Sequence, residues 1–276
     1  MKKELVVKDN ALINASYNLE LTEQRLILLA IVKARENSQG ITTDSQLEIH
    51  AKDYAMRFGV SLDAAYKSLR DAVDNLFERK FSYISEYKNT GKIGSVRSRW
   101  VSRVVYVEDL AILEVTFTPD VVELITKLEE RFTSYELKQI APLSSKYGIR
   151  LYELLIAWRN TGKTPEIKLV DLRNRLGIEE HEYLVMSDFK KRVLDHSITQ
   201  INTHTDITVT YEQHKAGRTI TGFSFAFKVK KSQKENPPKP QGETILGVLK
   251  ADIERLARAG ESYEQAAERI KKQGLV

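Results

Sequence analysis

The chain has 276 residues, 42% of them hydrophobic, and its 43 Lys and Arg against 38 Asp and Glu give a formal net charge of +5. At roughly 100–200 residues per domain this length predicts two domains, and the mild basic excess permits an anionic partner. Because the sequence contains no cysteine, it excludes a disulfide framework, a cysteine-ligated metal centre and a cysteine nucleophile.

No segment has the pattern of a membrane span or a signal peptide. The longest purely apolar run, residues 26–32, is much shorter than the roughly 20 residues that a transmembrane helix needs. Charges and Asn10 interrupt the N-terminal residues, which argues against a signal peptide. We therefore expect a soluble, cytoplasmic protein without a membrane partner.

The first half of the chain has the pattern of a winged helix. The predicted elements, in chain order, are a core helix at 22–35 capped by Thr22, a strand at 47–50, a helix at 51–58 ended by Gly59, a helix at 61–78 capped by Ser61, and strands at 81–87, 96–107 and 111–117. The two middle helices form a helix-turn-helix. The first two strands flank a polar loop, residues 88–92, which is typical of a hairpin. We therefore expect this hairpin to be the wing.

The pattern then occurs a second time. Residues 48–60 and 166–178 align at an offset of 118, with five identities in thirteen positions, and such self-similarity indicates a repeated unit. Each copy follows a long apolar helix, at 22–35 and at 146–159. After the second copy we expect a helix at 187–202, then strands at 207–212 and 219–229 joined by a turn at 213–218.

These patterns predict an α+β chain with two tandem winged-helix domains, residues 1–133 and 134–231, and a tail at 232–276. Residues 232–242 contain three of the six prolines and read as a linker. Two short helices, 244–258 and 262–272, are expected to follow. The first carries an apolar stripe of Leu246, Leu249, Ile253 and Leu256. That stripe either packs on its own domain or binds a partner.

The predicted helix at 187–202 has two different faces. At 100° per residue, its apolar side contains Phe189, Val193, Leu194, Ser197, Ile198 and Ile201. The N-terminal part of the second helix of a helix-turn-helix enters the major groove of DNA, where Lys, Arg and Ser side chains reach bases or phosphates. A plain solvated surface is the alternative. The candidate DNA contacts on this helix are Ser187, Lys190, Lys191, Arg192 and Thr199.

The turn at 213–218 supplies further candidates, namely His214, Lys215 and Arg218, because a cation at a wing tip can meet the DNA backbone or minor groove. The local charge of both regions also favours DNA contact. Residues 187–231 contain eight Lys and Arg against four Asp and Glu, and residues 86–103 contain five against one. Two basic modules on one chain suit a long DNA site.

Three features of the sequence resemble patterns found in enzymes. Gly162-Lys163-Thr164 resembles the end of a phosphate-binding loop, but Ala157 stands where that motif needs glycine. The five histidines are isolated, without the spacing of metal ligands. The acidic pairs at 129–130 and 179–180 read as surface. We therefore expect no catalytic residue, no metal and no cofactor.

Several motifs in order carry a family resemblance. They are residues 10–19 followed by Glu23-Gln24-Arg25-Leu26, residues 64–69 with 76–79, Trp100-Val101, Phe117-Thr118, residues 132–135, residues 143–155 (LSSKYGIRLYELL), residues 189–194, and Ile201-Asn202 with Thr205-Asp206. Over about residues 5–230 the chain resembles the RepB-type replication initiators of theta-replicating, iteron-bearing bacterial plasmids. The tail lies outside this resemblance.

The resemblance implies a protein that binds origin direct repeats (iterons) as a monomer, with helix 187–202 in the major groove. The first winged helix would contact the backbone and minor groove, and its candidate residues are Lys67, Arg70, Lys88, Lys92, Arg97 and Arg99. It also implies a homodimer, formed mainly through the first domain's sheet, that binds an inverted repeat and represses its own gene, in equilibrium with the monomer. Arrays of bound protein would recruit the host initiator ATPase and replicative helicase.

None of these steps needs catalysis by the chain. Two other classes of function remain open. One is a tandem winged-helix transcriptional regulator without an initiation role. The other is a protein-interaction scaffold, which would lack salt-dependent DNA affinity.

Overall fold

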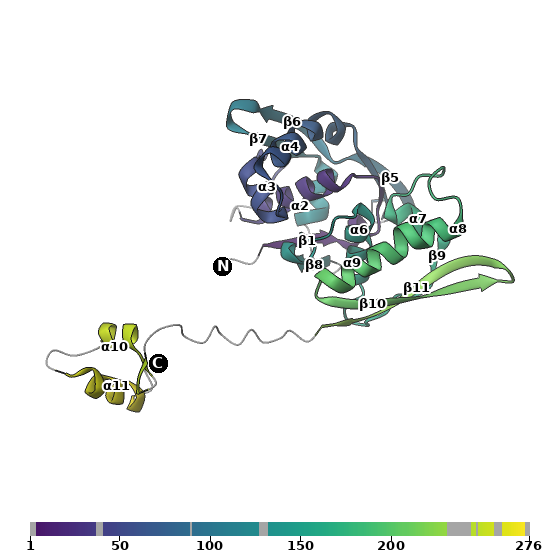
Figure 1. Cartoon of the computed structure of the whole chain (residues 1–276). Helices are drawn as coiled ribbons and strands as arrows, with labels where there is room; N and C mark the ends of the chain where they lie inside the picture. Colours follow the sequence, from purple (N-terminus) through teal and green to yellow (C-terminus); the bar gives the residue numbers. More distant parts are fainter. Residues whose placement is uncertain are drawn as a thin grey trace. The chain divides into compact units, whose positions relative to one another are not determined.

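The computed structural model describes residues 4–36, 41–88, 90–126, 132–230, 244–246, 248–256 and 261–273. The chain divides into two compact units, residues 1–230 and 231–276 (Figure 1). The first unit contains both winged helices. The second unit contains the tail.

The first winged helix follows the predicted order of helices. Its elements are α2 (Leu21–Glu36), β3 (Leu47–His50), α3 (Ala51–Phe58), α4 (Leu62–Glu78), β6 (Val101–Val107), η1 (Glu108–Leu110) and β7 (Ile112–Phe117). Gly59 ends α3 at a φ of 62°, a conformation that glycine adopts without strain. Ser61 caps α4 as predicted, since its hydroxyl accepts the backbone N–H of Ala64. The three strands form one sheet in the order β3–β7–β6.

The second winged helix has the same plan. Its elements are α6 (Lys146–Ile156), β9 (Ile167–Lys168), α7 (Leu169–Leu176), α8 (Met186–Asp188), the π-helical segment η3 (Phe189–Asp195), α9 (His196–His204), β10 (Ile207–Ala216) and β11 (Thr219–Val229). The sheet order is β10–β11–β9, which corresponds strand by strand to the first sheet. Gly177 ends α7 at a φ of 74°, as Gly59 ends α3. The predicted repeat and the fold of two tandem winged helices are therefore confirmed.

The first half carries additional elements around its winged helix. They are β1 (Leu5–Asp9), α1 (Asn10–Ile13), β2 (Ser16–Tyr17), β4 (Lys80–Glu86), β5 (Ile93–Arg99), α5 (Pro119–Thr126), β8 (Phe132–Glu136) and η2 (Leu137–Gln139). Strand β1 pairs with β8, and β2, β4 and β5 form a sheet of their own. The predicted domain division at residue 133 falls inside β8, and its position stays a prediction.

The predicted wing of the first domain is wrong. The expected strand at 96–107 is two strands, β5 and β6, and the break between them is Trp100. The indole of Trp100 is fully buried and contacts the rings of Tyr17 and Phe81, each with a centroid distance of 4.9 Å. Because the chain turns into the core here, β5 stays in the sheet with β4, and β6 enters the sheet with β3. The wing is therefore the β6–β7 hairpin, and the β4–β5 hairpin is an insertion.

Smaller corrections concern the ends of elements. Helix α2 begins at Leu21 rather than being capped by Thr22, and the Glu23 carboxylate accepts the backbone N–H of Glu20 at 2.8 Å. Helix α6 ends at Ile156, before the predicted residue 159. The predicted turn at 213–218 is shorter, because β10 runs to Ala216 and β11 starts at Thr219.

The tail differs from two plain helices. Its elements are β12 (Thr244–Ile245), β13 (Val248–Leu249), α10 (Lys250–Leu256) and α11 (Tyr263–Lys272), so the predicted helix at 244–258 begins six residues late. Leu246 is exposed in the turn of the small hairpin, whereas Ile253 is buried with Val248 and Ile270 in the tail's own core. The predicted stripe is therefore split. The predicted linker at 232–242 lies outside the described residues.

A buried polar cluster joins the two winged helices within unit 1. Glu153 of α6 accepts hydrogen bonds from Lys8 Nζ of β1 at 2.6 Å, from Tyr135 OH of β8 at 2.6 Å and from Arg150 Nη1 at 2.8 Å. Burial alone would raise the pKa of Glu153, but Lys8 and Arg150 outweigh it and hold that pKa at about 2. A carboxylate with three such donors is ionised in the folded protein.

Arg150 extends the cluster to the backbone of both winged helices. Its guanidinium donates to the carbonyls of Ile13 and Ala15 in the first half and of Arg175 in the second. Close by, a Cβ added at Gly177 would lie 2.2 Å from the carbonyl oxygen of Tyr17, so α7 packs tightly on β2. These contacts fix how the two helix-turn-helix units are placed relative to each other.

Candidate nucleic-acid interface

The helical segment from Met186 to His204 presents polar side chains to solvent. The predicted apolar face is confirmed, since all its members are buried except Ile198, which is half-buried. Phe189 anchors this face against Phe223 of β11, with a centroid distance of 5.9 Å. On the outer side, Lys191, Arg192 and Thr199 are exposed. The π-helical winding of residues 189–195 was not predicted, because a 3.6-residue period describes only the α-helix.

The cations of this segment are only weakly engaged. Arg192 Nε lies 3.8 Å from Asp188 Oδ1, and both side chains are at least half exposed. Such a pair contributes at most a few tenths of a kcal/mol and leaves the guanidinium available. Lys191 has no ion-pair partner within the described part of the chain. Thr199 donates its hydroxyl to the carbonyl of Asp195 at 2.8 Å, and Ser187 is exposed at the start of the segment.

The wing is attached to this helix by side-chain contacts. Lys190 Nζ donates to Gln213 Oε1 at 3.2 Å, and Tyr211 OH donates to Asp195 Oδ1 at 2.9 Å. Burial, together with Asp195, raises the pKa of Tyr211 to about 12, so its hydroxyl remains a donor at neutral pH. Of the predicted contacts, Lys190 is thus already used to hold the wing against the helix.

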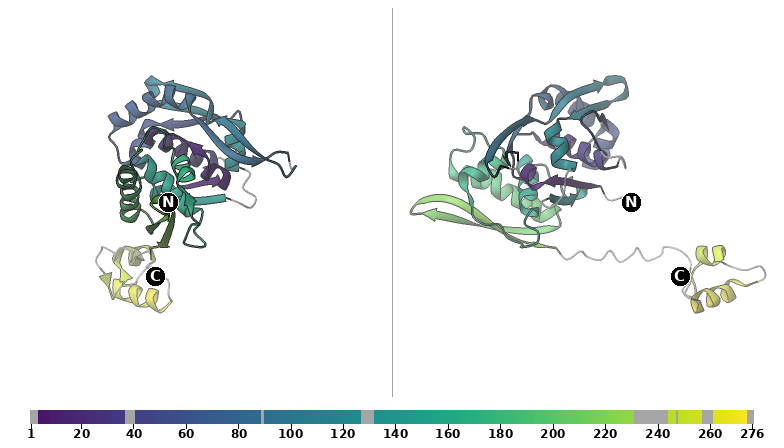
Figure 2. Two further views of the ribbon diagram at one scale, coloured as in Figure 1. Left: turned by 90° about the vertical axis from the view of Figure 1, so that its right-hand side faces the viewer. Right: turned by 180° about the vertical axis from the view of Figure 1, so that it is seen from behind.

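The tip of the wing carries free cations. Lys215 and Arg218 are exposed beside the tight turn at Gly217, and within the described residues neither has an ion-pair partner. His214 differs, because its ring nitrogens lie 2.8 Å from Ser224 Oγ and 3.9 Å from Glu166 Oε2. The tip of β10–β11 and α8 lie on the same side of unit 1 in two opposite views (Figures 1 and 2). The structure therefore brings the predicted helix and wing residues to one side.

The candidates of the first winged helix are dispersed. Lys67 and Arg70 are exposed on α4, but Arg70 Nη2 lies 2.5 Å from Glu108 Oε1. Glu108 and its neighbour Asp109 belong to η1, at the tip of the true wing. The first wing is thus acidic at its tip, unlike the second. The insertion hairpin carries the exposed Lys88 and Lys92 near its turn.

Arg97 and Arg99 border a pocket on the β2–β4–β5 sheet. Its volume is about 630 Å³, and its lining residues are Ser16, Lys80, Phe81, Ser82, Arg97, Ser98 and Arg99. Arg99 is held by Glu78 at 3.0 Å and by the Phe77 carbonyl at 2.7 Å. Lys80 was missed by sequence reasoning. The register of the β4–β5 hairpin would have pointed to it, because this register places Lys80 opposite Arg99 and Ser82 opposite Arg97 on one face of the sheet.

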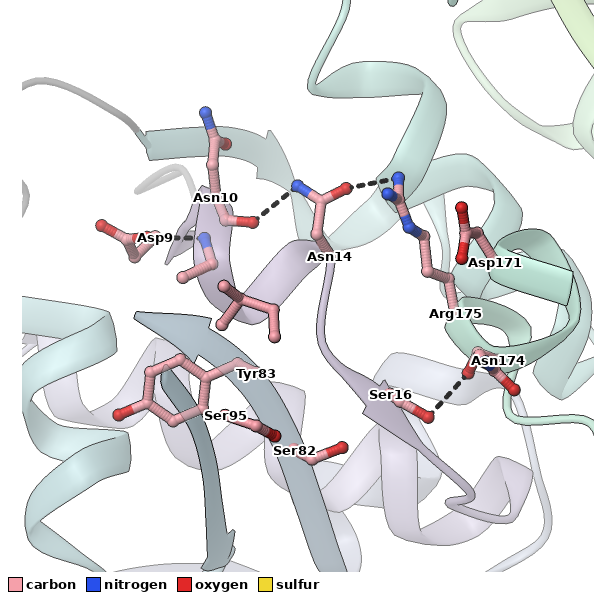
Figure 3. Close-up of a pocket in the computed structure, with 12 residues that line it drawn as sticks. Asp9, Asn10, Asn14, Ser16, Ser82, Tyr83, Ser95, Asp171, Asn174 and Arg175 are labelled. Carbon is pink, nitrogen blue, oxygen red and sulfur yellow. Dashed lines mark hydrogen bonds between the residues drawn. The ribbon is translucent and has the colours of Figure 1, made fainter. Parts of the chain in front are cut away.

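A second pocket of about 630 Å³ lies where the two winged helices meet (Figure 3). Hydrogen bonds cross the boundary at its rim: Arg175 Nη1 donates to Asn14 Oδ1 at 2.9 Å, and Ser16 Oγ donates to the Asn174 carbonyl at 3.0 Å. Asn14 in turn donates to the carbonyl of Asn10. The polar groups of this pocket therefore hold the two halves together.

The phosphate-loop-like motif has a structural role. The Thr164 hydroxyl accepts the backbone N–H of Phe225 and donates to the carbonyl of Pro165, so the segment fastens the chain after α6 to β11. Within the described residues, no three His, Asp or Glu side chains gather as metal ligands. Of the acidic pairs, 129–130 lies outside the described residues. No helix in the described ranges is both long and apolar enough to span a bilayer.

Fold and site together define a tandem winged-helix protein of the DNA-binding class, and exposed cations on the second helix-turn-helix and its wing lie on one side. Residues 5–156 match the family described as initiator replication protein, WH1, and residues 168–227 match initiator Rep protein, WH2. The chain therefore belongs to this family of replication initiators, and the resemblance drawn from its motifs is confirmed.

Similar proteins include both sequences and solved structures. An Escherichia coli protein described as an uncharacterized 27.6 kDa protein is 26% identical over 225 residues, 79% of this chain and 92% of that protein. The crystal structure of the Pi initiator protein in complex with iteron DNA has a TM-score of 0.68, with 21% identity, and covers 84% of this chain and 99% of that chain. The MSBI1.176 WH1 domain is 50% identical, covers 45% of this chain and 94% of that chain, and has a TM-score of 0.37.

Proposed function

We propose that this chain starts plasmid replication by binding the direct repeats of an origin as a monomer. The observation that carries the proposal is the cluster of exposed cations on the second helix-turn-helix, Lys191 and Arg192 on the helix and Lys215 and Arg218 at the wing tip. Family membership supports the initiator role. The fold is also similar to that of an initiator protein solved in complex with iteron DNA.

The two winged helices would divide the work. The segment from Met186 to His204 would lie in the major groove, where Lys191 and Arg192 reach guanine edges or phosphates, and the second wing would contact the neighbouring backbone. The first half would add phosphate contacts from Lys67, Lys80 and Arg97. Arg70 and Arg99 are already paired with acids, so we assign them smaller contributions.

Regulation completes the proposal. A homodimer, formed through the sheet of the first domain, would bind an inverted repeat and repress the initiator's own gene, in equilibrium with the monomer. The exposed Ile84 and Ile93 on the β4–β5 hairpin offer apolar area for such a contact. Arrays of bound monomers would then recruit the host initiator ATPase and the replicative helicase. Every step takes place in the cytoplasm and requires binding, not catalysis, by this chain.

The test is fluorescence anisotropy with short duplexes tiled across the DNA that flanks the gene, over a salt series and with random competitor DNA. Tight binding to several repeated tiles supports initiation, binding to one palindromic tile supports a regulator, and no specific binding by monomer or dimer refutes DNA recognition. The variant Lys191→Ala with Arg192→Ala should lower affinity for the specific tile. Each lost base contact should lower the binding free energy by about 1–3 kcal/mol. Each lost phosphate contact should reduce the slope of log affinity against log salt concentration by about one.

A matched control is available in the tail. Lys271 and Lys272 are also adjacent exposed cations on a helix, but they lie outside the family match. Lys271→Ala with Lys272→Ala should leave affinity unchanged. If the double variant at 191 and 192 binds like the wild type, the recognition face is assigned wrongly.

A further inference from the structure

The loop between α7 and α8 holds two apolar side chains in solvent. Leu184 is 77% exposed and Val185 is 60% exposed, and Val185 is the N-cap residue of α8. Single exposed apolar residues are common on protein surfaces. Here two branched aliphatic side chains are adjacent, and they stand at the leading end of the recognition helix.

The loop backbone is fixed in this conformation. Arg173 of α7 donates to the carbonyl of Tyr183 at 3.1 Å and to the carbonyl of Glu182 at 2.6 Å. Tyr183 has a positive φ of 45°, which is unfavourable for a bulky residue, and its ring packs on Tyr147 at a centroid distance of 5.9 Å. The surrounding contacts therefore hold the chain so that the next two side chains point away from the core.

Two acids of the same loop already accept hydrogen bonds. Glu179 Oε1 accepts from Asn18 Nδ2 of the first winged helix at 2.9 Å, and Glu182 Oε2 accepts from the backbone N–H of Glu179 at 2.9 Å. On the other side of the apolar pair, the chain continues into Ser187, Lys191 and Arg192, which are exposed. The apolar pair is therefore continuous with the cationic face of the recognition helix.

This placement identifies a ligand chemistry. Residues at the N-terminal end of a recognition helix meet base edges in the major groove. Among the four bases, thymine alone presents a methyl group there, and it is recognised by apolar side chains. We propose that Leu184 and Val185 contact thymine methyl groups and so help to determine which sequence the second winged helix binds. The proposal rests on the proposed function, because it assumes that this helix enters the major groove.

The experiment removes the methyl group alone. In the specific duplex found by tiling, each thymine is replaced in turn by 2′-deoxyuridine, and affinity is measured for the wild type and for Leu184→Ala and Val185→Ala. We expect the wild type to lose about fourfold at one or two positions, the equivalent of one buried methyl group. The matching alanine variant should bind the thymine duplex more weakly and should no longer distinguish thymine from deoxyuridine there.

Val170→Ala is the matched control, because Val170 is a valine of similar exposure, 67%, on the first helix of the same helix-turn-helix. It should keep the full response to deoxyuridine. All these side chains are exposed, so thermal unfolding of the variants should match that of the wild type.

Other outcomes overturn the inference. If the wild type binds its site specifically but responds to deoxyuridine at no position, thymine methyl groups are not contacted, while the proposed function stands. The inference also fails if the alanine variants keep the wild-type response, or if they lose affinity equally on both duplexes. If binding to the thymine duplex is unchanged in both alanine variants, Leu184 and Val185 do not contact the DNA, and the inference fails. Absence of any specific binding by the wild type overturns the proposed function first.

Discussion

Removing the charge of Glu153 should destabilise the protein far more than removing its partner Lys8. The cluster contains two cations and one anion, all buried, with Glu153 between Lys8 and Arg150. Glu153→Gln leaves two buried cations without an anion, and breaking a buried pair in this way costs about 3–5 kcal/mol. Lys8→Met leaves Glu153 paired with Arg150 and hydrogen-bonded to Tyr135. Burial lowers the pKa of Lys8, so its ammonium group is held at a desolvation cost, and we expect a loss of only about 1 kcal/mol.

The pKa of Glu153 gives an independent magnitude. A fall from about 4.3 in the unfolded chain to about 2 in the fold corresponds to about 3 kcal/mol. Because the folded pKa is the lower one, this stabilisation is present above about pH 4.3 and is lost as the pH falls towards 2. The difference in unfolding free energy between the wild type and Glu153→Gln should therefore shrink by about half between pH 5 and pH 3.

Urea unfolding at a series of pH values measures both effects. Lys138→Met is the control for loss of a lysine charge, since Lys138 is exposed and pairs with Glu136 at the surface, and it should cost at most about 0.5 kcal/mol. If Lys8→Met costs as much as Glu153→Gln, the cluster behaves as a simple ion pair and the role assigned to Arg150 is wrong. If the difference in unfolding free energy between the wild type and Glu153→Gln does not change with pH, Glu153 is not the ionised group of the cluster.

Two further predictions concern packing. Gly177→Ala should lower the free energy of unfolding by about 3 kcal/mol or more, because the new Cβ meets the Tyr17 carbonyl oxygen at 2.2 Å. Gly59 has a similar φ but open space around it, so Gly59→Ala should lower that free energy by only about 1–2 kcal/mol. Equal urea midpoints for the two variants would contradict the close approach of α7 to β2. A chain ending at Lys230 should keep the urea midpoint and the DNA affinity of the full chain, because the tail buries its own core; a lower midpoint would show that the tail supports unit 1.

Local signals predicted the helices well, and their physical causes explain this. Gly59 and Gly177 end helices because each adopts a positive φ, and Ser61 begins one because its hydroxyl satisfies a free backbone N–H. The buried face of residues 187–202 followed from spacing alone. Even the π-helical winding did not move Phe189 or Val193 out of the core, since both are large and apolar.

Strand partners could not be predicted in the same way. A hairpin pattern shows that β4 pairs with β5, but it does not show which sheet the hairpin joins. That choice depends on Trp100, whose burial against Tyr17 and Phe81 is a tertiary contact. The wing of the first domain was therefore assigned to the wrong hairpin. The charge count in residues 86–103 also gives no information about side-chain pairing, so Arg99 was predicted as a DNA contact although Glu78 and the Phe77 carbonyl hold it.

The buried cluster fixes how the two helix-turn-helix units are placed relative to each other, and this placement bears on the proposed DNA binding by both halves. Lys8, Arg150 and Glu153 connect β1 and α6, and Arg150 also binds carbonyls on both sides of the boundary. With Gly177 packed on Tyr17, the two helix-turn-helix units form one preorganised body. If both units contact DNA as proposed, the second unit is already placed when the first one binds, so the second contact costs little additional entropy. The proposed function then favours a DNA site whose two halves have the matching spacing over two separate half-sites, and the buried charges would support specificity for the whole repeat.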